Sequence, residues 1–238
     1  MWEMLIFGNY RDRIRLNMKH DKWDCIDMNY TKIDLENWQR ADIFKFFIDK
    51  RRIVCSLTVD INVTALVRFA KENGLRFYPA MIWAVAKIIN RHDEFKFAFN
   101  ENGELVKWDY VSPYYADFHK EDENFSKLLT EYSENIFEFH QRFVADCDAK
   151  KNLRGFDENI PQNFFDVSCL PWVRYSHIDA HVFDEGKFLA PVIVWGKFEE
   201  VNGKLVMPLT MNIHHAVADG FHISRFFNEL QEFIDSLK

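Results

Sequence analysis

The pattern of apolar and polar positions predicts helices and strands interspersed along one chain. Apolar residues at helical spacing predict helices over residues 63–70, 80–90, 128–151 and 223–237, and an aromatic-rich helix or turn over 38–49. Apolar segments bounded by turn residues predict strands over residues 53–61, 95–99, 104–108, 164–176, 189–198 and 204–215. Without strict strand-helix-strand alternation or a glycine-rich phosphate loop, the pattern favours a mixed α/β sandwich over a dinucleotide-binding fold.

Residues with local conformational preferences mark several boundaries. Asn62 is a candidate N-cap for the helix over 63–70, and Asn73-Gly74 supplies its end. Turn-forming residues at 100–103 and 202–203 predict two antiparallel hairpins.

Composition and charge exclude some classes of protein. The chain of 238 residues is long enough for one large domain, and its net charge of −7, from 30 basic and 37 acidic residues, argues against a nucleic-acid partner. No apolar run approaches the roughly 18 residues of a membrane-spanning helix, and no secretory signal opens the chain, so we expect a cytoplasmic protein with no membrane partner. The four cysteines lack C-x-x-C spacing and predict reduced, mostly buried thiols.

The segment 213–222, between a predicted strand and the last helix, concentrates polar residues with chemical potential. It contains His214, His215, Asp219 and His222. A histidine beside a carboxylate can act as a general base. The same residues are also compatible with a polar turn at a strand end and a helix cap at Asp219, and composition alone does not separate the two interpretations.

Two further polar groups resemble metal sites. His177, Asp179 and His181 are close in sequence, but i, i+4 histidines share a face only on a helix, and this segment has a strand-and-turn pattern. The acidic run 121–123, with Asp117, is typical of a solvated loop. We therefore expect no metal.

His215-Ala216-Val217-Ala218-Asp219-Gly220 has the H-x-x-x-D-G form of coenzyme A-dependent acyltransferases. With its flanking residues it resembles the chloramphenicol acetyltransferase family, as do segments 28–34, 37–38, 77–79, 164–172, 190–191 and 207–209. The resemblance covers residues 28–238 and leaves 1–27 as an N-terminal extension. It implies a one-domain, mixed two-layer α/β sandwich that forms a homotrimer with active sites at subunit interfaces, and acetyl-CoA as co-substrate.

The resemblance also implies roles for individual residues. His215 matches the base that deprotonates a substrate hydroxyl for direct attack on the thioester, whereas His214 is expected to be structural and to point to the opposite face. Ser168 matches a serine that stabilises the tetrahedral intermediate. Asp219 and Arg40 match a structural ion pair.

The acceptor implied by the resemblance is the hydroxyl of chloramphenicol or a related small molecule. The residues expected to bind it are Phe46, Phe47, Tyr114, Phe118, Ile178, Val192 and Val194, with Tyr115 adding to an aromatic wall. Several positions depart from the family pattern: Phe47 replaces a tyrosine, Val194 a threonine and Ala218 a cysteine, while Ile178 and Ala180 change the pocket's shape. These departures weaken the case for chloramphenicol as the acceptor more than the case for acetyl transfer as the reaction.

Two other functions remain open at this point. One is a non-catalytic trimeric relative that binds a small apolar ligand, which would explain the hydroxyls lost at Phe47 and Val194. The other is transfer of a longer acyl chain, or from a carrier protein, because H-x-x-x-D-G also occurs in dihydrolipoamide acyltransferases and peptide-synthetase condensation domains. The short chain counts against the second.

Overall fold

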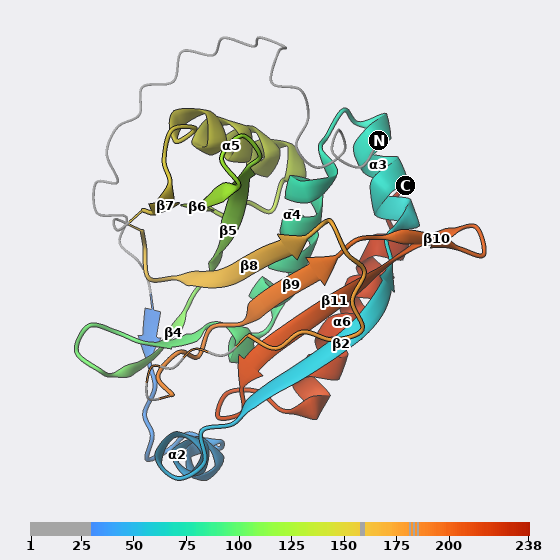
Figure 1. Cartoon of the computed structure of the whole chain (residues 1–238). Coiled ribbons are helices and arrows are strands. Elements are labelled where there is room, and N and C mark those ends of the chain that lie inside the picture. Colours follow the sequence, from blue (N-terminus) through green and yellow to red (C-terminus); the bar gives the residue numbers. More distant parts are fainter. Residues whose placement is uncertain (1–29, 158–159, 181, 183, 185) are drawn as a thin grey trace.

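A mixed sheet of eight strands organises the chain (Figure 1). The computed structural model describes residues 30–157, 160–180, 182, 184 and 186–238. In spatial order the strands are β10 (Glu199–Val201), β11 (Lys204–His214), β9 (Val192–Gly196), β8 (Phe164–Leu170), β5 (Ser112–His119), β6 (Asn124–Leu129) and β7 (Gly155–Phe156), and β2 (Val54–Asn62) pairs along β11. Contacts of β8 with β5 and β9, and of β6 with β7, are parallel, and the others are antiparallel. A small sheet of β1 (Tyr30–Lys32), β4 (Leu105–Trp108) and β3 (Phe97–Phe99) lies beside it.

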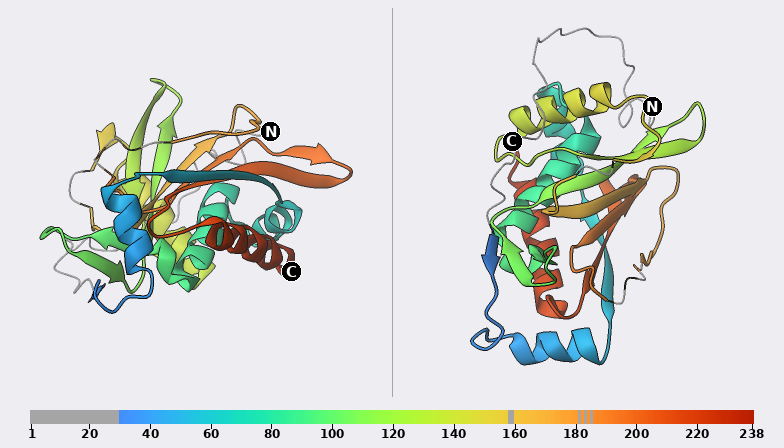
Figure 2. Two further views of the ribbon diagram at one scale, coloured as in Figure 1. Left: turned by 90° about the horizontal axis from the view of Figure 1, so that it is seen from below. Right: turned by 90° about the vertical axis from the view of Figure 1, so that its left-hand side faces the viewer.

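The helices form a second layer on one face of the large sheet (Figure 2). They are α3 (Thr64–Glu72), α4 (Phe77–Arg91), α5 (Ile136–Ala149) and α6 (Gly220–Asp235), with a 3-10 turn η1 at Asp93–Phe95. The central helix α4 contacts α3, α5 and α6 and is buried on most sides. The short helix α2 (Ala41–Asp49) lies at the end of the molecule opposite α5. This arrangement confirms the prediction of a mixed α/β sandwich.

Side-chain alternation gives the two faces of the sheet different chemistry. On the helix side, apolar residues such as Trp195, Leu209 and Met211 are at most 1% exposed. Burying each such side chain contributes about 1.5–3 kcal/mol. The opposite face, called here the open face, carries a polar set: Ser56, Thr58, Asp166, Ser168, Thr210, Asn212 and His214. The helices thus stabilise one face of the sheet and leave the other for polar side chains.

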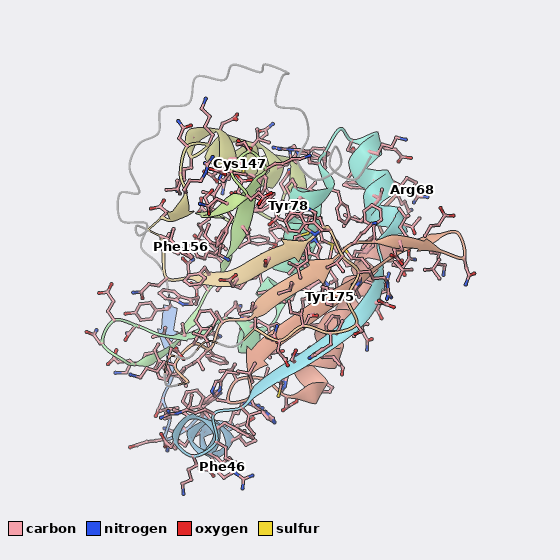
Figure 3. The ribbon with its side chains drawn as sticks, viewed as in Figure 1. Phe46, Arg68, Tyr78, Cys147, Phe156 and Tyr175 are labelled. Atoms are coloured by element: carbon pink, nitrogen blue, oxygen red, sulfur yellow. The ribbon has the colours of Figure 1, made fainter. Side chains whose placement is uncertain are left out.

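The connection from β8 to β9 crosses part of the open face. The Tyr175 hydroxyl donates to the Val194 carbonyl at 2.7 Å, and the Ser56 hydroxyl donates to the Ile178 carbonyl at 3.3 Å. Tyr175 is drawn in front of the strands in Figure 3. Thr210, Asn212 and His214 are consequently buried although they do not face the helices.

Most predicted elements are confirmed, including both antiparallel hairpins. The prediction for 128–151 is wrong at its start, because Leu128 and Leu129 end strand β6 and α5 begins only at Ile136. The strand predicted over 164–176 ends at Leu170. The residue before α3 is Val63 rather than Asn62, although the Asn62 side-chain oxygen still accepts from the Thr64 N–H at 3.2 Å.

Three of the four cysteines fall in the described part of the chain, and all three are free. Only Cys147 is buried, while Cys55 and Cys169 are partly exposed, so the expectation of mostly buried thiols is wrong for two of them. Cys25 lies outside the described residues. Within the described residues, no helix has the length and apolar character to span a bilayer.

His140 couples the packing of α5 to pH. Its Nε2 accepts a hydrogen bond from the backbone N–H of Arg76, just before α4, at 3.1 Å. Burial, and secondarily the positive charge of Arg76, lower the pKa of His140 to about 4. Because the unfolded chain takes up this proton near pH 6.5, the stabilising contribution is complete above that pH and disappears as the pH falls through about 4.

We expect His140→Gln, which keeps an acceptor but cannot titrate, to be less sensitive to acid than the wild type. Urea unfolding at pH 7, 5 and 4 measures the difference. The free energies of unfolding of the two proteins should differ most in their slope against pH between about pH 4 and 6.5. Parallel curves over the whole range would contradict this role.

Candidate active site

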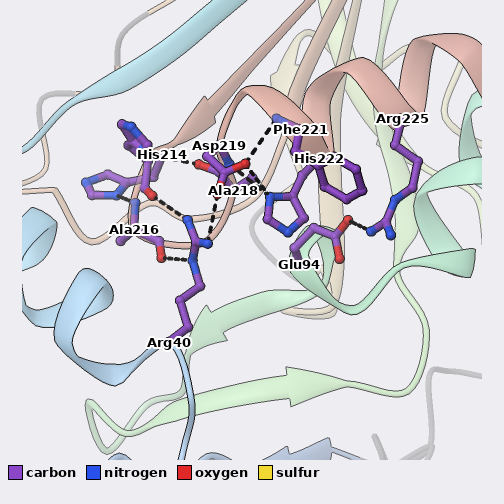
Figure 4. Close-up of polar contacts among 10 residues, drawn as sticks. Arg40, Glu94, His214, Ala216, Ala218, Asp219, Phe221, His222 and Arg225 are labelled. Atoms are coloured by element: carbon purple, nitrogen blue, oxygen red, sulfur yellow. Dashed lines mark hydrogen bonds and ion pairs between the residues drawn. The ribbon is translucent and has the colours of Figure 1, made fainter.

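The predicted reactive segment forms a turn between β11 and α6 (Figure 4). The backbone N–H groups of Val217 and Ala218 donate to the His214 carbonyl at 3.1 and 3.4 Å. Ala216, Val217 and Ala218 are fully buried. The turn is therefore packed into the core, and its geometry is set on both sides by regular structure.

Arg40 holds this turn from the residue that precedes α2. Its Nε donates to the Ala216 carbonyl at 2.9 Å, one Nη donates to the His215 carbonyl at 3.1 Å, and the other donates to Asp219 at 3.1 Å. The predicted pair of Arg40 and Asp219 is thus present. The Arg40 side chain is 16% exposed and that of Asp219 is 35% exposed, so the pair is only partly shielded from water.

Asp219 has a second role, because it caps α6. One carboxylate oxygen accepts from the Phe221 N–H at 3.0 Å, and the His222 ring lies 2.9 Å from the same oxygen in a capping box. Partial burial opposes the charged form, but the hydrogen bond from Arg40 and the proximity of His222 keep the pKa of Asp219 below its ordinary value. Asp219 therefore both caps α6 and pairs with Arg40.

The His215 ring has the tautomer that a general base needs. Its Nδ1 lies 3.1 Å from the Ala218 carbonyl, and because a carbonyl only accepts, Nδ1 must carry the hydrogen. This leaves the Nε2 lone pair free to take a proton. The ring is half-buried and stacks on Phe47, with centroids 4.1 Å apart and planes 16° from parallel. Phe47 thus fixes the ring's orientation, a role its sequence position did not reveal.

His214 has the opposite arrangement. It is 3% exposed on the open face, and its Nδ1 accepts from the Ala216 N–H at 3.1 Å. The hydrogen of the neutral ring must therefore be on Nε2. Burial lowers the pKa of His214, in opposition to the attraction of Asp184, and so favours the neutral ring.

Ser168 and His215 of one chain do not meet. Ser168 of β8 is opposite Val194 of β9, which is opposite Thr210 of β11. His215 follows Thr210 by five residues, or roughly 16 Å at about 3.3 Å per residue, and two strand spacings add about 10 Å sideways. The single chain therefore brings together His215, Arg40, Asp219 and Phe47, but not Ser168.

The residues expected to bind the acceptor fall into separate groups. Phe46 is exposed and packs edge-on against Phe47. Val192 and Val194 share the open face with Ser168, and Ile178 lies over this face through its contact with Ser56.

The aromatic residues of β5 divide between the two faces of the sheet. Tyr114 packs on Phe164, and Phe118 packs on Trp172. Tyr115 instead points into the core, where its hydroxyl lies 2.9 Å from that of Thr130. The expectation that Tyr115 adds to the aromatic wall is wrong, because neighbouring residues of a strand face opposite sides.

Lys127 and Asp166 form an ion pair on the open face that sequence reasoning missed. The Lys127 ammonium also donates to the Tyr114 carbonyl at 3.2 Å and lies over the Tyr114 ring. Burial lowers the pKa of Lys127 and raises that of Asp166, against their mutual attraction. The available signal was Asp166 itself, a carboxylate between the apolar residues Phe165 and Val167 of β8.

The groups that resembled metal sites make other contacts among the described residues. Among the described residues, no three His, Cys, Asp or Glu side chains are arranged to bind a metal ion. His177 contacts the Thr58 hydroxyl and Asp179, and His181 lies outside the described residues. The acidic run 121–123 is the exposed turn between β5 and β6, where Asp122 pairs with Arg154.

Solved structures define the class of this fold. A chloramphenicol acetyltransferase superposes with a TM-score of 0.77 at 24% identity, covering 88% of this chain and all of that one. The dihydrolipoamide acetyltransferase of Azotobacter vinelandii superposes with a TM-score of 0.60 at 15% identity, covering 78% of this chain and 82% of that one. The fold is thus shared with acyltransferases.

The sequence comparison is more specific. The chloramphenicol acetyltransferase family model matches residues 28–231. The chloramphenicol acetyltransferase of Clostridium perfringens is 36% identical over 86% of this chain and 94% of its own length, and chloramphenicol acetyltransferase 3 of Escherichia coli is 37% identical over 88% and 99%. The chain therefore belongs to the chloramphenicol acetyltransferase family of acyltransferases, as the H-x-x-x-D-G motif predicted.

Because Arg40 also donates to two carbonyls, we expect that a side chain with only its positive charge cannot replace it. Arg40→Lys keeps one positive charge but cannot reach three acceptors at once. We expect it to lower kcat at least tenfold while the melting temperature falls only a little, because the turn around His215 loosens. Arg40→Met, which leaves Asp219 without its partner, should lower the melting temperature more.

Arg40→Met should lower the free energy of unfolding by less than the about 3–5 kcal/mol that is typical of breaking a fully buried ion pair, since Asp219 is partly solvated. Steady-state kinetics and thermal unfolding measure both variants. Full activity in Arg40→Lys would show that the carbonyl contacts do not position the turn.

Proposed function

We propose that the protein is an acetyl-CoA-dependent O-acetyltransferase that acts on a hydroxyl of chloramphenicol or a related small molecule. The geometry of His215 carries this proposal: a half-buried ring held by a carbonyl and an aromatic stack, with its Nε2 free. The names of the relatives and the family support the choice of acyl group and acceptor.

The proposed reaction needs no acyl-enzyme. His215 Nε2 removes the hydroxyl proton as the acceptor oxygen attacks the thioester carbonyl of acetyl-CoA. The Ser168 hydroxyl donates to the oxyanion of the tetrahedral intermediate, a contact worth about 3 kcal/mol. The intermediate then expels the coenzyme A thiolate, which takes the proton from the imidazolium.

This mechanism requires two chains. Ser168 on β8 and His215 at the end of β11 lie far apart in one chain. We therefore propose that His215 of one subunit faces the open face of another. The subunits then form a homotrimer with a site at each interface. The polar open face, which the helices do not cover, supports this arrangement. The presence of both a base and an oxyanion donor favours an enzyme over a non-catalytic relative.

A two-chain site predicts complementation between inactive variants. His215→Ala and Ser168→Ala should each lose activity, His215→Ala by at least a thousandfold and Ser168→Ala by about a hundredfold. Co-expressed with different affinity tags and purified as mixed oligomers, they should regain a substantial fraction of wild-type activity, because some interfaces combine an intact His215 with an intact Ser168.

Co-expression of His215→Ala with the double variant His215→Ala/Ser168→Ala is the matched control, since no interface then contains a base. Mixed oligomers of the two single variants with no regained activity would disprove the shared site. Equal losses in His215→Ala and His214→Ala, with both still assembled, would show that the base is misassigned.

Phe47 offers a test of acceptor choice. Phe47→Tyr keeps the stack on His215 and adds the hydroxyl typical of the family. A neutral hydrogen bond is worth about 0.5–1.5 kcal/mol, so we expect the KM for chloramphenicol to fall by several-fold, up to about tenfold, with the KM for acetyl-CoA unchanged. Phe47→Leu, which loses the stack, should instead lower kcat. An unchanged KM in Phe47→Tyr would place the acceptor away from this ring.

We also propose that residues 1–27 are an extension that catalysis does not need, and that the enzyme works in the cytoplasm with its co-substrate. A chain beginning at Met28 should assemble as the full chain does and keep the same order of preference among alcohols. Gel filtration and a thiol-release assay measure the two properties. Insolubility or a changed acceptor preference would show that the extension belongs to the fold or the site.

A further inference from the structure

A cavity of about 560 Å³ lies on the open face, between the ends of β2, β9 and β11 and the connection from β8 to β9. Its volume is in the range of sites for small organic molecules. Apolar side chains form much of its wall, including Val54, Ala180, Phe188 and Val192. Ala180 and Val192 are among the residues expected to contact the acceptor.

Two buried donors in the cavity wall have no partner among the described residues. They are Nδ2 of Asn212 and Nε2 of His214, in side chains that are 1% and 3% exposed. His214 Nε2 carries the ring hydrogen because Nδ1 accepts from the Ala216 N–H. The Asn212 oxygen faces the Ala180 N–H at 3.5 Å, which leaves the amide NH₂ for the cavity. Leaving a buried donor unpaired costs about 1–3 kcal/mol, so an oxygen acceptor in the cavity would be favourable beside each of these two N–H groups.

The charges around the cavity favour a neutral occupant. Arg52 and Asp184 are the charged side chains among its described lining residues, and their formal charges cancel. Asn212 and His214 are two residues apart on β11, so their donors project from the same side about 7 Å apart. A matching ligand is a neutral molecule with two separate oxygen acceptors on an apolar body.

We propose that Asn212 and His214 are specificity-determining residues, whose N–H groups bind two oxygens of the acceptor alcohol in this cavity. The inference rests on the proposed acetyltransferase function and assigns to its acceptor two hydrogen-bond donors of the open face. His214 of one subunit is then a binding residue, while the base that acts on the same acceptor is His215 of another subunit.

Chloramphenicol is a suitable probe, because it is neutral and carries nitro, amide and hydroxyl oxygens. Calorimetric titration in the absence of acetyl-CoA gives its Kd. We expect Asn212→Leu and His214→Asn each to weaken binding by about three- to tenfold without loss of melting temperature. Leucine removes an unpaired donor, and the asparagine oxygen can still accept from the Ala216 N–H.

Thr210→Val is the matched control from the same face of β11. Its hydroxyl has partners, since it lies 2.7 Å from that of Thr58 and donates to Tyr175 at 3.1 Å, and it does not line the cavity. This variant should show the reverse result, a lower melting temperature with an unchanged Kd. Gel filtration of all variants checks the assembly.

Three outcomes would overturn the inference: no binding by the wild type, an unchanged Kd in both cavity variants, or weaker binding only where the oligomer dissociates, which would assign the donors to the subunit interface. The failure of the proposed function has a different signature. In that case the wild type binds chloramphenicol, the cavity variants weaken the binding, and no alcohol is acetylated from acetyl-CoA.

Discussion

The guanidinium of Arg40 is the contact on which the reactive turn depends. It comes from a residue 175 positions before His215 and donates to two backbone carbonyls and one carboxylate of a six-residue segment. A hydrogen bond to a charged group contributes about 1.5–3 kcal/mol, roughly twice a neutral one. The orientation of His215 follows from this, because its Nδ1 is held by the Ala218 carbonyl of the same turn.

The large sheet separates stabilisation from chemistry. One set of alternating residues packs on α4 and its neighbouring helices, and the other set faces away from them. The two adjacent histidines end this alternation: His214 belongs to the open face, and His215 lies past the strand on Phe47. Their rings hold the hydrogen on opposite nitrogens, so two identical side chains have different acid-base properties.

Local patterns in the sequence predicted much of the fold. Helices α3, α4 and α6 have strong apolar periodicity, and the hairpins at 100–103 and 202–203 have strong turn residues. The hairpin of β5 and β6 was missed because Tyr114 and Tyr115 are both buried, one on each face, so the strand has no alternation to read. The helix predicted from residue 128 was wrong at its start for a different reason, since the apolar end of β6 continues into the pattern of α5.

The candidate site was predictable where a motif fixes it and not where distant strands meet. The motif and the resemblance gave His215, Asp219 and Arg40. The pairing of Lys127 with Asp166, and the separation of Ser168 from His215 within one chain, both depend on strand order and register. A single sequence does not determine these, because the strands involved are joined by long connections.

The packing of the reactive turn limits how this protein can change by mutation. The carbonyls of His214, His215, Ala216 and Ala218 each accept a hydrogen bond, and residues 216–218 have no exposed surface. An insertion would displace several acceptors at once, and a bulky side chain would have to enter a fully buried position. Variation at these positions is therefore restricted to small side chains, and alanine at 218, where the family pattern stated above has a cysteine, is one of them. Under the proposed function, new acceptor preferences would arise outside the turn, at residues such as Phe47, on the open face of the sheet and in the connection that crosses it.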